Sequence, residues 1–534
     1  MKNKKSAPAK KPASIKAPPA KVKPAPAKKP PVVIKKPVAA PKKVTPSPAK
    51  SLPAPATKPV TKVSGGKGVA IAVWENDPES GFKLSKSSAP TLALGSLPLQ
   101  INGTAPKAAL YTPGTSSFRY WNAAEALRRA RDLWRPYLPE GIQWQLGTAL
   151  EVQIDGGDDL NAYYDRKTLS FLQGTVKGKA IHTADSPDII AHEFGHAVLD
   201  VLRPDLWDAA LDEVAAFHES FGDITAILTA LQQESVCEAV LKETGGMLYQ
   251  SSPVSRLAEQ FGKAVHALNP HSAPADCLRN AVNSLFYREP MHLPAMAPHT
   301  ELSSEPHSYS RLFTAAFFEG VAGMLKVQST KPKVEDLMQV GRDAAAILCK
   351  AVRSSALSAA FYSEVAAQVI WADGALFEGK YDGPLRSAFV RRGILSLEAV
   401  RSLRAEASRI VSTGKPNSGG DEMPRGRDMM MRASAYGLGE GALVVRTASF
   451  SRRGMIASAA LDAGSTPVPG VEQATQSFLE TLFRRGRVDF SQCKAGLSSV
   501  PHGQIKRKTH YLIEQNGQFH LHRRCFDDGY EADL

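Results

Sequence analysis

Apolar residues recur every three or four positions over several long segments of the chain, a spacing typical of amphipathic helices. Two such segments are neighbours in the middle of the sequence, at Ser186–Val201 and Val214–Leu228, and Pro187 suits the first turn of the first helix. The same spacing predicts further helices at Trp121–Tyr137, Tyr309–Leu325, Lys333–Ser354, Ser358–Ala372 and Leu385–Val390.

Changes in composition divide the 534 residues into five segments. Residues 1–67 are rich in Lys, Pro and Ala and cannot bury enough apolar surface to fold, so we expect a disordered tail. Residues 68–230 predict short strands with two or three helices, and residues 231–395 predict helices almost throughout. A Gly-, Ser- and Pro-rich linker is expected within residues 396–420.

The last segment, residues 421–534, predicts a small accessory α+β domain of unknown role. Its expected elements are strands at Ala442–Ala448, Thr509–Glu514 and Gln518–Arg523 and a helix near Gln473–Arg485. The fold class predicted for the chain as a whole is therefore α+β.

The basic charge of the chain lies in its tail. Residues 1–67 hold 18 lysines and no acidic residue or arginine, so the other 467 residues carry a formal charge of −4 within a total of +14. A mildly acidic body argues against a nucleic-acid-binding fold. The tail itself has two interpretations, a solubilising spacer and a contact for polyanions such as nucleic acid, anionic lipid or cell-wall polymer.

Signals for export or membrane insertion are not evident in the sequence. Lysines and prolines interrupt every apolar run in the first 60 positions, and no run of 18 or more apolar residues predicts a transmembrane segment. Five scattered cysteines favour free thiols in a reducing compartment. We therefore expect a cytoplasmic protein by default, with non-classical export as the alternative.

The most informative chemistry lies in the motif His192-Glu193-Phe194-Gly195-His196. Residues four apart share one face of a helix, so His192 and His196 can bind one metal ion while Glu193 faces the open coordination position. Glu219 and Asp223 lie one turn apart on the next predicted helix. Two histidines and a glutamate are a common ligand set for a catalytic zinc.

This pattern predicts one Zn²⁺ held by His192, His196 and Glu219, with Glu193 as general base. Asp223 is expected to accept the free ring N–H of a zinc histidine and so to fix its orientation. The alternative is a helix with ordinary surface or core histidines, which the pair Glu219 and Asp223 makes less plausible.

Together with the zinc motif, three further segments resemble the thermolysin-like zinc metallopeptidases, the glutamate-zincins. The segment 161–165, Asn-Ala-Tyr-Tyr-Asp, resembles the family's edge strand Asn-Ala-Phe-Trp-Asp. Residues 306–310, Pro-His-Ser-Tyr-Ser, resemble the segment that carries the family's catalytic histidine. Residues 278–280, Leu-Arg-Asn, resemble the family's Leu-Arg-Ser, and Arg279 precedes His307 by 28 residues. The resemblance covers about residues 68–395.

The resemblance implies a two-lobed zincin catalytic unit and the activity of a zinc-dependent endopeptidase acting on a peptide or protein substrate. Asn161 and Ala162 would bind an extended peptide as an added strand, and His307 would stabilise the transition state. In the family the positions of Ile189 and Leu278 line the pocket for the residue after the scissile bond, which implies a hydrophobic preference there. Arg279 would reach the adjacent substrate carbonyl.

Two family features that assist the histidine are changed here. The family's oxyanion tyrosine, about nine residues before the third ligand, is missing from the stretch Trp207–Leu211, where Trp207 is a candidate replacement. An aspartate that orients the catalytic histidine is replaced by Leu302, and Glu301 and Glu305 are candidates to take its role.

The stretch Ile224–Gln233 carries no acidic residue, so calcium is not supported. These departures leave an alternative function, a non-catalytic binding or scaffold protein on a degenerate metallopeptidase fold. A third hypothesis is a metal-dependent hydrolase of a non-peptide amide, although Asn161 favours an extended peptide. The oligomeric state does not follow from the sequence.

Overall fold

The computed structural model describes residues 68–93, 95, 97–397, 426–449, 470–493 and 508–528. These residues all belong to one compact unit of the chain, Pro55–Leu534. The predicted basic tail, its polyanion contact and nearly all of the predicted linker lie outside the described residues.

A five-stranded mixed sheet underlies the first part of the chain, with strand order β16-β5-β6-β4-β3. Three strands run parallel and the two at one edge run antiparallel to their neighbours. Two small antiparallel hairpins accompany it. The strands of this region are β1 (Ala70–Val73), β2 (Ser85–Ser88), β3 (Leu99–Ile101), β4 (Leu150–Gln153), β5 (Ala162–Tyr164), β6 (Thr168–Phe171), β7 (Gln173–Val176), β8 (Lys179–His182) and β16 (Phe526–Asp527).

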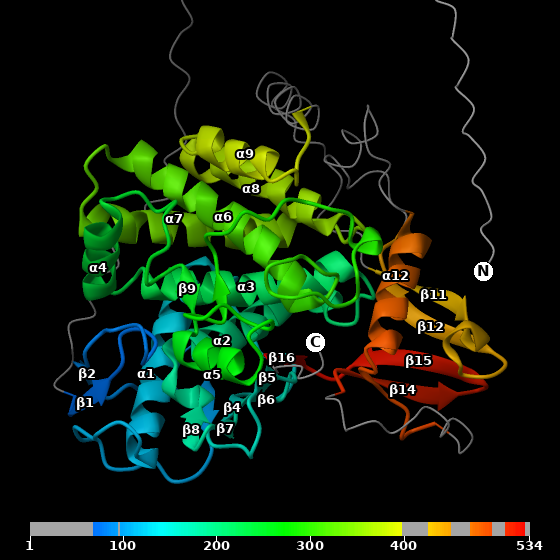
Figure 1. The fold of residues 1–534 in the computed structure, drawn as a ribbon, viewed down its shortest axis with the longest axis horizontal. Helices are drawn as coiled ribbons and strands as arrows, with labels where there is room; N and C mark the ends of the chain where they lie inside the picture. The colour runs from blue at the N-terminus through cyan, green and yellow to red at the C-terminus, as the bar shows by residue number, and fades with distance from the viewer. Residues whose placement is uncertain are drawn as a thin grey trace, which may run out of the picture. The chain divides into compact units, whose positions relative to one another are not determined.

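Strand β16 joins this sheet from the far end of the sequence. It pairs antiparallel with β5, with Phe526 opposite Tyr164 and Asp527 opposite Tyr163. In Figure 1, β16 lies beside β5 close to helix α2. The sheet is thus completed by a segment more than 350 residues away, a pairing that no local sequence pattern predicts.

Three helices form the centre of the molecule: α1 (Ser116–Trp134), α2 (Pro187–Leu202) and α3 (Asp212–Ala230). The side chain of Ser186 accepts a hydrogen bond from the backbone of α2 and begins the helix, as expected for an N-cap. Every residue of α3 is buried, and so is nearly all of α2, so these two helices are surrounded by protein on every side. This burial removes their polar side chains from bulk water.

The following region is mainly helical, as predicted, and helices α6 to α9 lie together above α3 in Figure 1. Helices α4 and α5 and the short pair β9 and β10 were not predicted from the sequence. The elements are α4 (Glu234–Thr244), β9 (Arg256–Leu257), α5 (Glu259–Leu268), β10 (Arg279–Asn280), α6 (Pro306–Gln328), α7 (Val334–Ser354), α8 (Phe361–Phe377) and α9 (Asp382–Arg391).

The described part of residues 421–528 forms a second five-stranded sheet, in the order β11-β12-β15-β14-β13, with one helix packed against it. Its apolar cluster includes Leu443, Phe478, Leu479 and Leu512. Strand β11 was not predicted, because its sequence Arg-Asp-Met-Met-Met-Arg lacks an alternating pattern. The elements are β11 (Arg427–Arg432), β12 (Ala442–Thr447), α12 (Val471–Arg484), β13 (Val488–Asp489), β14 (His510–Gln515) and β15 (Gln518–Arg523).

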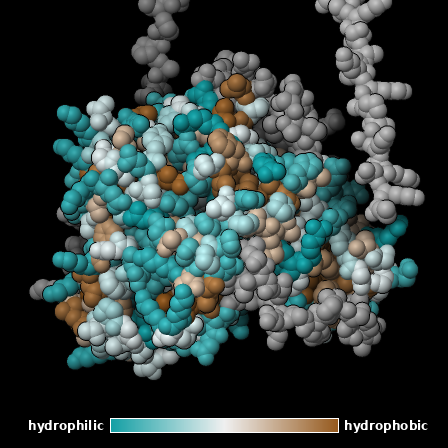
Figure 2. All heavy atoms as spheres, viewed as in Figure 1, coloured by the Kyte–Doolittle hydropathy of each residue, from teal (hydrophilic) through white to brown (hydrophobic). Residues whose placement is uncertain are grey.

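The predicted α+β class is confirmed by these mixed sheets and helices. Within the described ranges, no helix combines the length and apolarity that crossing a membrane requires. Figure 2 shows one face of the molecule as mostly hydrophilic, with small hydrophobic patches interrupted by polar residues. The five cysteines are all free, and three of them are buried.

Candidate functional site

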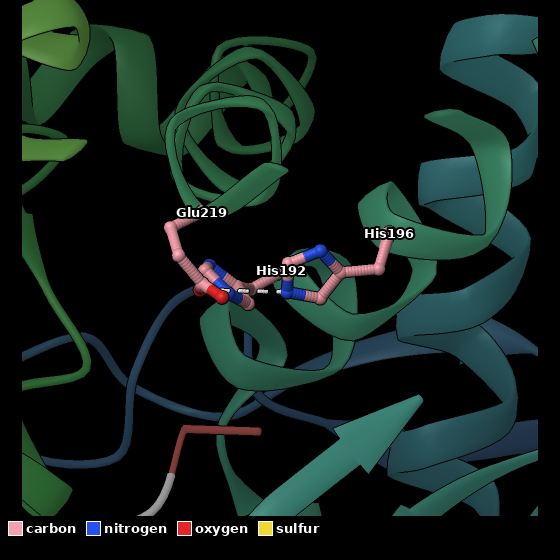
Figure 3. A group of neighbouring side chains, drawn as sticks. All are labelled: His192, His196 and Glu219. Atoms are coloured by element: carbon pink, nitrogen blue, oxygen red, sulfur yellow. Dashed lines mark hydrogen bonds and ion pairs between the residues drawn. The ribbon is translucent and has the colours of Figure 1, made fainter. Parts of the chain in front are cut away.

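The side chains of His192, His196 and Glu219 converge between helices α2 and α3 (Figure 3). The distance from Glu219 Oε2 to His192 Nε2 is 3.2 Å, and to His196 Nε2 it is 3.5 Å. Ligands of a tetrahedral zinc at bond lengths of about 2.0–2.1 Å lie roughly 3.3–3.5 Å apart. The three residues therefore form a candidate metal-binding triad with the spacing that zinc requires.

Two glycines let the helices approach closely enough to form this triad. A Cβ built on Gly222 of α3 would lie 2.7 Å from the ring of His192. A Cβ on Gly195 of α2 would lie 2.9 Å from the Cα of Gly222. Only glycine leaves room at these two positions, so the close helix crossing and the position of His192 depend on them.

Asp223 lies behind the triad, where the sequence predicted an orienting carboxylate. Its Oδ1 is 3.0 Å from Nδ1 of His192. Arg279 donates three further hydrogen bonds to Asp223, at 2.8, 3.0 and 3.1 Å. Burial alone would raise the pKa of Asp223, but Arg279 and His192 outweigh it and hold that pKa below its usual value. An ionised Asp223 can fix the imidazole of His192 in one orientation.

Glu193 lies on α2 beside His192 and is fully buried. Neither of its carboxylate oxygens has a hydrogen-bond partner among the described residues. Burial raises the pKa of Glu193 well above its usual value, and the charge of Asp528 raises it further. Both ring nitrogens of His196 also lack hydrogen bonds within the described chain. Buried polar atoms are seldom left unpaired, so these atoms point to a missing ligand.

The charges around the triad also favour a cation. Four buried carboxylates lie around the ring of His192: Glu193, Glu219 and Asp528 each place an oxygen within 4.8 Å of a ring nitrogen, Asp223 contacts Nδ1, and Arg279 pairs with Asp223 and Asp528. Burying carboxylates without compensating charge is costly. A divalent metal would supply that compensation, so the donor set and its charge both fit zinc.

His307 begins helix α6 and faces the triad from the opposite side. Its Nε2 is 3.2 Å from Oε2 of Glu219, and its Nδ1 is 2.8 Å from Oε1 of Glu305. Burial lowers the pKa of His307, but Glu219 and Glu305 outweigh it and raise that pKa well above its usual value. Of the two candidates to orient His307, the structure selects Glu305, whereas Glu301 is exposed.

Trp207 does not serve as the oxyanion donor that the sequence suggested. Its indole N–H donates to the backbone oxygen of Arg523 at 3.3 Å, so its single donor is already engaged. Arg523 in turn donates to the backbone oxygen of Trp207 at 2.8 Å. Trp207 therefore holds Arg523 at the end of β15. The suggestion that Trp207 replaces the family's oxyanion tyrosine was wrong.

The predicted substrate-binding residues are distributed around the triad. Leu278, Arg279 and His307 line one cavity of about 130 Å³, whereas Ile189 is buried in α2 and does not line that cavity. Asn161 and Ala162 lie at β5, beside the triad, and the backbone oxygen of Ala162 accepts a hydrogen bond from the backbone N–H of Asp528 at 2.9 Å.

Sequence reasoning missed two features of this region. The first is the segment Phe526–Asp528, which reaches the triad from the end of the chain. The second is a separate buried group of carboxylates, Asp77, Asp188 and Glu259. No sequence signal could have found either group, because its members are far apart in the chain and meet only through the tertiary fold.

Comparisons with known proteins place few constraints on the function. No protein-family model matches the chain, and no curated protein matches it. Among solved structures it is similar to the precursor of protealysin, a metalloproteinase from Serratia proteamaculans, with a TM-score of 0.34 and 15% sequence identity. That match covers 62% of this chain and 90% of the other. The case for a function therefore depends on the side chains of the site.

Proposed function

We propose that the protein is a zinc-dependent endopeptidase, a glutamate-zincin with two lobes. The observation that carries the proposal is the buried triad of His192, His196 and Glu219 with the unpaired carboxylate of Glu193 on the same helix. Three protein ligands leave one coordination position open, and a general base beside that position is the arrangement of a hydrolytic zinc site.

The residues of the chain have distinct roles in peptide hydrolysis. A bound zinc would supply Lewis-acid chemistry, polarising a carbonyl oxygen and acidifying water. Glu193 takes the proton of the attacking water and later gives it to the leaving amine, a role that suits a buried carboxylate whose oxygens have no hydrogen-bond partner among the described residues. His307, whose pKa is also raised, donates a charged hydrogen bond to the developing oxyanion. Glu305 keeps the ring of His307 in position.

The proposed substrate is an extended peptide that adds to the edge of β5. The carbonyl of Ala162, which in this structure accepts the N–H of Asp528, is the backbone acceptor for that peptide, and Oδ1 of Asn161 has no hydrogen-bond partner in the described part of the chain. The cavity beside Leu278 is expected to take an apolar side chain after the scissile bond, so cleavage before Leu, Ile or Phe is favoured. Such a pocket discriminates by roughly 1–3 kcal/mol.

A non-catalytic scaffold is the second candidate function. The observation that favours it is that the edge of β5 is already paired with β16, so that a substrate would compete with a segment of the same chain. The absence of an oxyanion role for Trp207 points the same way. Against it stands the complete set of ligands and base, which a binding protein would have no need to keep.

The test combines metal content with cleavage of an unbiased peptide library by the full chain. We expect about one zinc per chain, and Glu193→Gln should keep the zinc while turnover falls by about 10²–10⁴-fold, because the base contacts water and not the ligands. Glu151→Gln, an exposed glutamate on β4, is the matched control and should change nothing. A chain that binds no zinc, or a Glu193→Gln variant that cleaves normally, would contradict the proposal.

A further inference from the structure

The last described residues of the chain lie in the candidate active site in the manner of a bound peptide. Phe526 and Asp527 form a strand on the edge of β5, and the next backbone N–H, that of Asp528, donates to the carbonyl of Ala162. The sequence assigned this same carbonyl to substrate binding. Adding a strand to a free sheet edge is a common mode of peptide recognition.

The side chain of Asp528 points at the metal triad. Its Oδ1 is 3.8 Å from Nε2 of His192 and 3.8 Å from Nε2 of His307. Arg279 holds the same oxygen at 3.1 Å, while Oδ2 has no hydrogen-bond partner within the described residues. Asp528 is 5% exposed and lies within ligand distance of both His192 and Glu193. A carboxylate in this position is a potential additional ligand of the metal.

Phe526 anchors the segment by stacking on two histidines, one of which, His196, belongs to the triad. Its ring stacks on His218 with centroids 4.0 Å apart and on His196 with centroids 4.9 Å apart. Arg523 covers its other face at 4.0 Å, and only 2% of Phe526 is exposed. The segment is therefore held by an apolar anchor, a backbone hydrogen bond and a carboxylate, three kinds of contact that a bound peptide would use.

The accessory domain holds the segment at a fixed place. The backbone oxygen of Arg523, at the end of β15, accepts from the indole of Trp207, and the backbone N–H of Arg523 donates to Oδ1 of Asp208 at 2.8 Å. Arg487 pairs with Asp527 at 3.4 Å. Because the segment is tethered, its effective concentration at the cleft is of millimolar order. To displace the segment, a free peptide must be present at a similar concentration or must bind more tightly than the segment does.

We propose that residues 525–528 are an intramolecular, substrate-like inhibitor of the zinc site, with the Asp528 carboxylate beside His192 and Glu193, where it would compete with the catalytic water. This inference rests on the proposed function for its effect on cleavage. The accessory domain thereby acquires a role, to present this segment. Displacement of the segment by a tightly binding peptide, or its removal by proteolysis, activates the enzyme.

Occupancy of the cleft can be tested without turnover, in the full chain carrying Glu193→Gln. Hydrogen exchange at the amides of residues 525–528 should be slow in this chain, and adding Phe526→Ala should speed it by at least about tenfold, as expected when a buried aromatic is lost. The carboxylate is tested separately by zinc affinity, measured against a competing chelator. Asp528→Asn should weaken it, whereas Asp527→Asn, which keeps an oxygen for Arg487, should leave it within about twofold.

Cleavage supplies the second measurement, in chains that keep Glu193. Phe526→Ala and Asp528→Asn should each raise kcat/KM on a short peptide by at least about fivefold, whereas Asp527→Asn should not. Rapid exchange at residues 525–528 in the parent chain, or equal zinc affinity of the two asparagine variants, would overturn the proposal. Slow exchange together with zinc binding and no cleavage, even by Phe526→Ala, would support the inhibitor geometry and sink the peptidase function instead.

Discussion

One group of buried carboxylates lies at the start of helix α2 and another lies between the middle of α2 and helix α3, and their environments differ. At the start, Asp188 lies beside Asp77 and Glu259, and all three are buried with no histidine in the group. Burial and the charge of Asp77 raise the pKa of Asp188 to about 8 and that of Glu259 to about 10.

On α3, facing the middle of α2, the same degree of burial has the reverse outcome for Glu219 and Asp223. Burial would raise the pKa of Glu219, but His307 and His196 outweigh it and hold that pKa well below its usual value. Asp223 is kept ionised in the same way by Arg279. The difference teaches that burial does not decide the charge of these groups. The neighbouring histidines and Arg279 decide it for Glu219 and Asp223, and ionised carboxylates beside His192 and His196 suit a metal.

The largest effect is expected from removing a metal ligand in the second group. If His192, His196 and Glu219 are the three protein ligands, His196→Ala should abolish stoichiometric zinc binding and lower turnover by more than about 10³-fold. Zinc content of the purified chain and peptide cleavage measure the two losses. His292→Ala, an exposed histidine, is the control. Stoichiometric zinc in His196→Ala would remove this residue from the ligand set.

The next effect concerns the buried cation that distinguishes the second group. Arg279→Met leaves Asp223 and Asp528 without their partner, and removing one member of a buried ion pair costs about 3–5 kcal/mol. We expect that loss in the free energy of unfolding by urea. Arg446→Met, which breaks an exposed pair with Asp428, should cost less than about 1 kcal/mol. Equal losses would show that the pairing of Arg279 adds nothing.

A smaller effect is expected at His307. If this histidine donates to the oxyanion, His307→Ala should lower kcat by on the order of 10²-fold with little change in KM, as for a contact made mainly in the transition state. Glu305→Gln should lower kcat less, since it removes only the charge that orients the ring. Steady-state kinetics on one peptide measure both. A loss below about fivefold in His307→Ala would make this histidine structural.

The two groups also differ in how far the sequence predicts them. His192 and His196 are one turn apart, and Glu219 and Asp223 are one turn apart on the next helix, so local periodicity places all four. Helices α2 and α3 were predicted within two residues of their observed ends for the same reason. The roles of these residues in catalysis stay predictions.

Contacts between distant segments could not be predicted. Asp77, Asp188 and Glu259 come from a loop and from the starts of two helices, and nothing in their neighbouring residues indicates that they meet. Strand β16 pairs with β5 because the accessory sheet delivers it there, and a two-residue strand has no pattern of its own. Tertiary packing, and not local propensity, decides both features.

The smallest effect tests the first group. The carboxyl group of Glu259 faces two acids, Asp77 and Asp188, and one cation, Arg256. Its oxygens have no hydrogen-bond partner among the described residues. Because the folded protein holds this proton to about pH 10 while the unfolded chain loses it near its ordinary pKa of about 4.5, stability falls as the pH rises between these values. Glu259→Gln cannot ionise and avoids that loss.

We therefore expect Glu259→Gln to stabilise the protein by on the order of 1–2 kcal/mol at pH 8 and by little at pH 4. Urea unfolding at the two pH values, in the presence of a chelator so that no added cation neutralises the acids, measures the difference. The matched control is Glu243→Gln, whose side chain is 45% exposed and pairs with the same Arg256. Because solvent already screens Glu243, its substitution should change stability equally at both pH values. A Glu259→Gln variant less stable than the parent at pH 8 would mean that this carboxylate is ionised and paired, as Glu219 and Asp223 are, and that the two groups are alike.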